Sequence, residues 1–234
     1  MFEREHHQRI ATVLQALDAQ ALLAHRCLFG GGTAIALRHG EYRESVDIDF
    51  LVSDAAGYRA LRQLLTGPDG LAPLLRPGMA VEQAREVRAD QYGIRTLVRV
   101  GGQGIKFEIV REGRIALDPP GAHDVVCGVA TLNPVDLAAS KLLANADRWN
   151  DDAVFSRDLI DLAMMAPPRA VLRPALAKAQ AAYGDSPRTD LLRAVDRLRR
   201  APLRLDQCMR TMRMDTVSKA VLWQRIRNLE KSVR

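Results

Sequence analysis

The chain has 234 residues, of which 47% are apolar and 26% are charged. This composition is typical of a globular protein with one or two domains. No apolar run is long enough to cross a bilayer, and the opening residues Met-Phe-Glu-Arg-Glu-His-His do not resemble a signal peptide. Cys27, Cys127 and Cys208 are scattered, which indicates reduced thiols and excludes a disulfide framework or a zinc site. We therefore expect a cytoplasmic protein with no membrane partner.

The net charge of +6 is unevenly distributed along the chain. Residues 188–234 carry 13 Lys or Arg against 5 Asp or Glu, a balance of +8, so the rest of the chain is at −2. Such a basic tail is typical of proteins that hold a polyanion. It is equally typical of solvated helices with basic outer faces, and the composition leaves both interpretations open.

Helices and strands alternate in the first half of the chain. Apolar spacing predicts a helix over 3–24, with His6 and His7 in an exposed terminus. The helices and strands predicted next, with a loop over 67–78, are strand 27–29, helix 33–38, strand 46–52, helix 57–65 and strands 80–88, 94–100 and 105–110. A Gly-Gly-Gln-Gly turn joins the last two strands.

The second half is helical throughout. Asn133 and Pro134 form a helix start, and the predicted helices cover 134–148, 155–165, 169–183, 189–200 and 215–231. We therefore expect an α+β protein with two domains. Residues 1–132 form a small mixed sheet with helices, and residues 133–234 form a helical bundle.

Residues 30–50 carry the clearest chemical signal. Gly31, Gly32 and Thr33 precede a short helix, where backbone N–H groups and the positive helix end favour phosphate. Asp47 and Asp49 stand two apart in an apolar run, so on one strand they share a face, while Val46, Ile48 and Phe50 point into a core. Two adjacent carboxylates suit a hard divalent cation, Mg²⁺ above all, with Mn²⁺ as an alternative.

This segment resembles the DNA polymerase β-like nucleotidyltransferases, and in particular the AbiEii/AbiGii toxin-like branch. The matching features are the Gly-Gly-Thr-Ala start and the end formed by Arg43, Ser45, Asp47, Ile48, Asp49 and Phe50. The resemblance implies that Asp47 and Asp49 bind catalytic metal and that Gly31, Gly32 and Thr33 bind nucleotide. Arg43 and Ser45 either contact phosphate or fix the loop that presents Asp47.

A third metal-binding carboxylate is expected on a neighbouring strand, and Glu108 is the candidate because it is an acid inside an apolar strand. The alternative is an edge-strand glutamate that faces solvent and pairs with Lys106. A Glu in place of the usual Asp of the polymerases reaches farther, which leaves direct metal contact open.

A second group of charged residues lies on two successive helices. Lys141 and Arg148 share one helix face, and Asp158 and Asp161 share a face of the next helix. These residues either form surface salt bridges of little energetic value or match the later motifs of the same family. In the second case Lys141 is catalytic and binds the triphosphate, Asp158 is a base or orients Lys141, and Arg148, Arg157 and Asp161 support the site.

The resemblance implies an enzyme that transfers a nucleoside monophosphate from a nucleoside triphosphate to an acceptor hydroxyl and releases pyrophosphate. It further implies the toxin of a toxin–antitoxin or phage-defence pair, with a cognate antitoxin and an RNA acceptor, the 3′ end of transfer RNA being the leading candidate. Two alternatives stay open: transfer to a protein side chain or small molecule, and a non-catalytic nucleotide-binding module.

Overall fold

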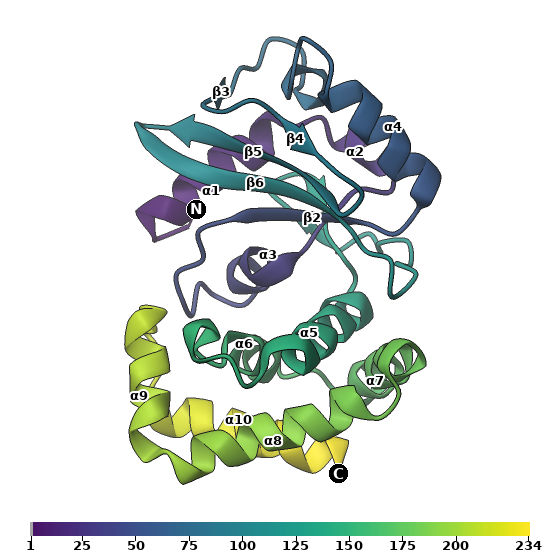
Figure 1. Cartoon of the computed structure of the whole chain (residues 1–234). Helices are drawn as coiled ribbons and strands as arrows, with labels where there is room; N and C mark the ends of the chain where they lie inside the picture. The colour runs from purple at the N-terminus through teal and green to yellow at the C-terminus, as the bar shows by residue number, and fades with distance from the viewer. Residues whose placement is uncertain (1) are drawn as a thin grey trace. The chain divides into compact units, whose positions relative to one another are not determined.

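The computed structural model describes residues 2–234, which divide into two compact units (Figure 1). The first unit comprises residues 2–37 and 45–133, and the second comprises residues 38–44 and 134–234. Because the segment 38–44 belongs to the second unit, the chain passes between the units at three points. The sequence predicted a single boundary between residues 132 and 133.

The first unit is built on a mixed sheet in the order β1-β2-β6-β5-β3, with β4 also paired to β5. Its strands are β1 (Leu28–Phe29), β2 (Ile48–Val52), β3 (Glu82–Gln83), β4 (Arg88–Ala89), β5 (Gly93–Val100) and β6 (Gln103–Arg111). β2 and β6 run parallel, whereas the other pairs are antiparallel. The parallel pair brings together two strands that are far apart in the sequence, and both carry predicted site residues.

One face of this sheet is the core of the unit. Ile48, Phe50, Phe107 and Ile109 are at most 1% exposed. The ring of Phe50 lies 5.6 Å from that of Phe107 and 5.5 Å from that of Phe29, measured between centroids. Side chains alternate between the faces of a strand, so this core leaves Asp49 and Glu108 on the opposite face.

The helices of the first unit are α1 (Glu5–Ala16), α2 (Ala19–Ala24), α3 (Gly31–Arg38) and α4 (Ala55–Leu65), with a short 3₁₀ turn, η1 (Ala72–Leu74). α1 crosses behind β5 and β6 in Figure 1. A small hairpin, β7 (Val125–Val126) and β8 (Val129–Ala130), completes the unit. The β5–β6 turn has positive φ at both Gly101 and Gly102, the backbone of a type I′ turn, so the glycine-rich hairpin turn is confirmed.

The second unit is helical. Its helices are α5 (Pro134–Arg148), η2 (Asp152–Val154), α6 (Arg157–Met165), α7 (Arg169–Tyr183), α8 (Ser186–Arg200), α9 (Pro202–Thr211) and α10 (Lys219–Val233). α5 packs against α6, α7 and α8, and α10 packs against α6 and α8 (Figure 1). α5 is therefore the central helix of the bundle, and it carries Lys141 and Arg148.

The predicted α+β fold class is confirmed, and several element boundaries are corrected. The single helix predicted over 3–24 is two helices, because the Asp18 carboxylate accepts hydrogen bonds from the N–H groups of Gln20 and Ala21 and starts α2. The strand predicted from residue 46 begins at Ile48, and Val46 is 48% exposed rather than part of the core. No helix in the described part of the chain is long and apolar enough to span a membrane.

Candidate functional site

The glycine turn is fitted against the carboxylate of Asp49. The N–H of Gly30 donates to the backbone oxygen of Asp49 at 2.8 Å, which ties the turn to β2. Gly31 has a φ of +67°, and a Cβ atom built on it would lie 2.5 Å from Asp49 Oδ2. Only glycine satisfies both conditions, so the start of α3 and the Asp49 carboxylate are in direct contact.

The segment 45–47, just before β2, is held by two hydroxyl groups. Thr33 Oγ1 lies 2.8 Å from Ser45 Oγ and 2.5 Å from the backbone oxygen of Asp47. A carbonyl oxygen only accepts, so the single Thr33 proton goes to Asp47, and the Ser45 hydroxyl donates to Thr33. Thr33 and Ser45 are 1% and 9% exposed. These contacts favour a role in fixing the Asp47 backbone.

Two histidines of α1 hold the same segment. The N–H of Ser45 donates to His7 Nε2 at 3.0 Å, and His6 Nε2 lies 3.0 Å from the Val46 backbone oxygen. His7 is fully buried, so the prediction that it belongs to an exposed terminus is wrong. A pair of histidines at a chain start gave no signal of this role, since the partners lie about forty positions away in sequence.

Asp47, Asp49 and Glu108 do not form a ready three-carboxylate metal site. Asp49 and Glu108 are register partners across β2 and β6, so they are neighbours on one face of the sheet. The two oxygens of Glu108, however, accept from Arg95 Nε at 2.8 Å and Lys106 Nζ at 2.6 Å. No group of three or more His, Cys, Asp or Glu side chains within residues 2–234 is arranged to hold a metal ion.

Glu108 therefore differs from both sequence-based interpretations. It lies on β6, inside the sheet, and its side chain is only 14% exposed, so it is not a solvated edge residue. The Lys106 pairing that the sequence suggested is present, and Arg95 adds a second cation. Asp47 and Asp49 are both half-buried, and their carboxylates are hard oxygen groups of the kind that Mg²⁺ takes as ligands together with waters and substrate phosphates.

In the second unit, α5 and α6 are joined by a buried ion-pair network. Lys141 Nζ contacts Asp158 Oδ1 at 2.9 Å and Asp161 Oδ2 at 2.8 Å, and Arg148 Nε donates to Asp158 Oδ2 at 2.7 Å. The side chains of Asp158 and Asp161 are 2% and 0% exposed, so these are not surface salt bridges. Lys141 is 7% exposed, whereas Arg148 is 40% exposed. Arg148 thus presents the more accessible positive charge.

The segment 38–44 completes this network. Arg43 donates to both oxygens of Asp161, at 2.6 and 2.9 Å, and the Tyr42 hydroxyl donates to Asp161 Oδ1 at 2.6 Å. The Arg43 side chain is 3% exposed. The geometry therefore favours the loop-fixing role for Arg43 over a contact with phosphate. Arg157 is half-buried at the start of α6.

These contacts keep both carboxylates ionised. Burial alone would raise the pKa of Asp161, but Arg43 and Lys141 outweigh burial and lower it. Burial would likewise raise the pKa of Asp158, but Lys141 and Arg148 lower it far below its ordinary value. A carboxylate that resists protonation so strongly is a poor general base. Asp158 is therefore suited to orienting Lys141 and Arg148.

The basic residues of the tail are largely paired within the second unit. Carboxylate partners are present for Arg193, Arg197, Arg199, Arg200, Arg204, Arg213, Lys219 and Arg234. These pairs favour the interpretation of residues 188–234 as helices with charged outer faces.

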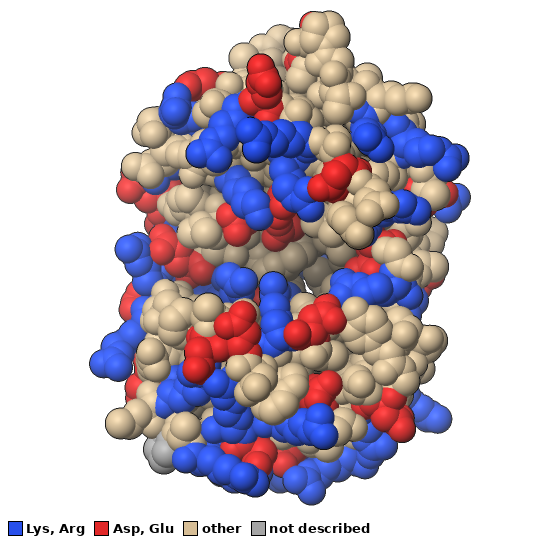
Figure 2. Space-filling model, in the orientation of Figure 1, with Lys and Arg blue, Asp and Glu red and all other residues tan. Residues whose placement is uncertain are grey.

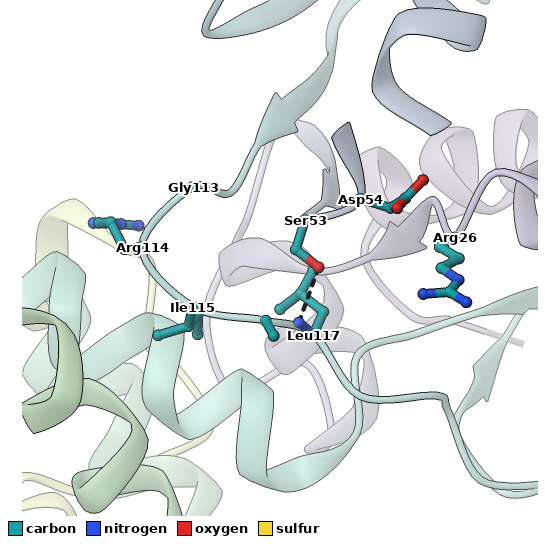
Figure 3. A pocket seen from close by; sticks show the side chains of 8 residues that line it. Arg26, Ser53, Asp54, Gly113, Arg114, Ile115 and Leu117 are labelled. Atoms are coloured by element: carbon teal, nitrogen blue, oxygen red, sulfur yellow. Dashed lines mark hydrogen bonds between the residues drawn. The ribbon is translucent and has the colours of Figure 1, made fainter. Parts of the chain in front are cut away.

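A hollow of about 360 Å³ lies beyond the carboxyl ends of β2 and β6, lined by Arg26, Ser53, Asp54 and residues 113–117. Figure 3 shows the Ser53 hydroxyl accepting from the N–H of Leu117, at 2.9 Å. The Asp54 carboxylate accepts from the Gly57 N–H and starts α4. Both polar groups therefore stabilise the fold, and none of the predicted site residues lines this hollow.

Comparisons with known proteins give one match in fold and one in family. A solved structure described as a "putative nucleotidyltransferase" from H. pylori is 18% identical and has a TM-score of 0.50, with 97% of this chain and 91% of that chain covered. At this identity the match shows the shared fold. No curated protein matches the chain. The model of the family described as "Nucleotidyl transferase AbiEii toxin, Type IV TA system" matches residues 12–228. The chain therefore belongs to the AbiEii family of nucleotidyltransferase toxins.

Proposed function

We propose that this nucleotidyltransferase transfers a nucleoside monophosphate from a nucleoside triphosphate to the 3′ hydroxyl of an RNA, with transfer RNA as the acceptor. The observation that carries this proposal is the fit of Gly31 against the Asp49 carboxylate. It brings together a helix start of the kind that binds phosphate and an acid of the kind that binds Mg²⁺. The family match supports the toxin half of a toxin–antitoxin pair, with an antitoxin as partner. The scattered cysteines favour the cytoplasm as its place of action.

Asp47 and Asp49 are the residues that would hold Mg²⁺, because two carboxylates plus substrate phosphates are a common ligand set for this ion. Bound there, Mg²⁺ would neutralise phosphate charge and lower the pKa of the attacking hydroxyl. The backbone N–H groups at Gly31 and Gly32 would bind triphosphate oxygens. Four residues would act through the backbone of segment 45–47, which carries Asp47; they are Thr33, Ser45, His6 and His7.

The reaction forms a bond between the acceptor oxygen and the α-phosphorus and breaks the bond from the α-phosphorus to the bridging oxygen, so pyrophosphate leaves. The hydroxyl proton goes to solvent or to a base. Asp158 is not that base in our proposal, since Lys141 and Arg148 lower its pKa. Glu108 is not a metal ligand in our proposal, since Arg95 and Lys106 occupy its two oxygens.

Lys141 and Arg148 are the cations of the second unit in our proposal. The contacts of Lys141 with Asp158 and Asp161 hold its ammonium group as a fixed charge rather than a mobile one. Arg148 is the more exposed cation of this network. Arg43 and Asp161 would fix the network from which Lys141 is presented.

The experiment offers each nucleoside triphosphate, labelled at the α-phosphorus, with Mg²⁺ to the protein and total bacterial RNA. Wild-type protein is expected to label a band of transfer RNA size, and Asp49→Asn is expected to label none. Asp206→Asn serves as the matched control, because it makes the same change in an exposed ion pair with Lys219. Label in protein or in a small molecule would mean that this molecule, and not RNA, is the acceptor. Triphosphate binding without any label would favour a non-catalytic module.

A further inference from the structure

A second hollow, of about 560 Å³, lies on the open face of the sheet of the first unit. It is lined by Arg85, Glu86, Arg88, Arg95, Thr96, Leu97 and Lys106. Four of these side chains are basic and one is acidic. Figure 2 shows Lys and Arg side chains gathered over β4, β5 and β6. The hollow is therefore a positively charged surface of a kind that binds phosphate groups.

The sheet register connects this hollow to the proposed metal site. Asp49 on β2 pairs with Glu108 on β6, Glu108 pairs with Arg95 on β5, and Arg95 pairs with Arg88 on β4. Paired residues lie on the same face of a sheet. Three strand spacings of about 4.8 Å put Arg88 about 14 Å from Asp49. The row thus leads from a candidate catalytic carboxylate to a cluster of cations.

The four cations that line the hollow form two groups, which differ in whether they have ion-pair partners. Arg95 contacts Glu108 and Asp90, and Lys106 contacts Glu108. Arg85 and Arg88 are exposed, and neither side chain has an ion-pair partner among residues 2–234. Their charge is available to a ligand without the loss of an existing contact.

The loop that carries Arg85 is held against the sheet. The Thr96 hydroxyl donates to the Arg85 backbone oxygen at 2.6 Å, and the N–H of Ala84 donates to the Leu97 backbone oxygen at 2.7 Å. The Arg85 backbone is therefore fixed beside β5. A fixed position reduces the entropy lost when a ligand binds.

We propose that this hollow binds the phosphate backbone of the RNA acceptor next to its 3′ end. Arg85 and Arg88 contact phosphates, and the row through Arg95 and Glu108 directs the terminal hydroxyl toward Asp49. The inference rests on the proposed function, because it takes the acceptor to be RNA. It places the RNA contacts on the first unit, whereas the composition offered the basic tail as one of two open interpretations.

The test compares wild-type protein with the double variant Arg85→Gln, Arg88→Gln, here called the pocket variant. The matched control is Arg59→Gln, Arg62→Gln, which removes two exposed arginines from α4 of the same unit. RNA binding is followed by the anisotropy of fluorescein-labelled bulk transfer RNA over a range of salt concentrations. The values of KM for RNA and for the triphosphate are measured in the labelling assay.

Loss of two phosphate contacts is expected to weaken RNA binding about tenfold near 0.1 M salt and to reduce the slope of log K against log salt by about 1.5. The KM for RNA rises to the same extent, the KM for the triphosphate is unchanged, and the control variant behaves as wild type. The proposal is overturned if the pocket variant binds RNA as wild type does, or if the KM for the triphosphate rises instead.

Failure of the RNA site can be distinguished from failure of the proposed reaction, because the binding measurement needs no turnover. If wild type transfers no nucleotide but the pocket variant alone loses RNA affinity, the proposed reaction fails and the RNA site stands. If wild type labels RNA and the pocket variant does so with unchanged KM, the reaction stands and the RNA site is wrong.

Discussion

Gly31 meets two requirements of the candidate site, one on backbone conformation and one on space. Its φ of +67° is in the left-handed region, and the missing Cβ leaves room for Asp49 Oδ2. Gly184 shares the first property, with a φ of +60°, but a Cβ there would meet no atom within 4 Å. The two glycines therefore separate the cost of the backbone conformation from that of displacing the carboxylate.

We expect Gly31→Ala to abolish nucleotide transfer, because the new methyl group must displace the Asp49 carboxylate. Gly184→Ala is expected to lose about 1–3 kcal/mol of unfolding free energy, because φ +60° with ψ −138° is a conformation that side chains rarely adopt, and to keep full activity. The labelling assay and urea denaturation provide the two readouts. Equal activity in the two alanine variants would mean that contact between Gly31 and Asp49 has no functional role.

His7 is expected to act on Asp47 through the backbone. Replacement by Phe removes the acceptor for the buried Ser45 N–H, at a cost of about 1–3 kcal/mol, and should lower kcat because segment 45–47 loses a contact. His7→Gln keeps an acceptor and should recover part of the loss. The assay is made well below the unfolding temperature of each variant. A purely structural role would leave kcat of the folded Phe variant at the wild-type value.

At the scale of elements, Asp161 joins three parts of the second unit. Arg43 and Tyr42 come from the segment 38–44, Lys141 comes from α5, and Asp161 itself is on α6. Removing one partner of a buried ion pair leaves an uncompensated charge, which is costly. The network therefore fixes the position of segment 38–44 relative to α5 and α6.

We expect Asp161→Asn to lower the unfolding free energy by about 3–5 kcal/mol at neutral pH. Asp206→Asn, in an exposed pair, should cost less than about 1 kcal/mol. Tyr42→Phe, which removes one hydrogen bond to Asp161, should cost about 1 kcal/mol and gives a milder test if Asp161→Asn does not fold.

The difference in unfolding free energy between wild type and Asp161→Asn should change with pH in one direction. The pKa of Asp161 is lower in the folded chain than its ordinary value, so its contribution is complete above the unfolded value of about 3.9. The contribution is lost as the pH falls below that value toward the folded pKa. The gap between wild type and Asp161→Asn should therefore be constant from neutral pH to about pH 5 and narrow below pH 4. A gap that widens in acid would contradict this assignment.

At the scale of the whole molecule, local signals predicted most of the elements. α5 and α7 have the predicted bounds, because Pro134 opens one, and Pro168 and Gly184 flank the other. α9 was missed because Pro202 looks like a break, whereas it occupies the first turn of a new helix. The strand predicted over 80–88 is two short edge strands separated by the loop of Arg85, a division that alternation of residues does not reveal.

The candidate site was predictable where its residues are close in sequence. The glycine turn, Asp47 and Asp49 lie within twenty residues, so their spacing alone indicated the chemistry. The pairing of Arg43 with Asp161 spans 118 positions, and that of Glu108 with Arg95 depends on the β5–β6 register. No local pattern encodes such contacts, which is why the structure was needed to choose between the two roles predicted for Arg43 and to find the role of His7.

The most direct test of the account compares triphosphates labelled at the α-phosphorus and at the γ-phosphorus, each with wild-type protein and Asp49→Asn. Transfer of a nucleoside monophosphate predicts that RNA retains the α-label and not the γ-label, and that Asp49→Asn transfers neither. Retention of the γ-label, or full activity in Asp49→Asn, would contradict the central claim that carboxylates beside the glycine turn support nucleotidyl transfer to RNA.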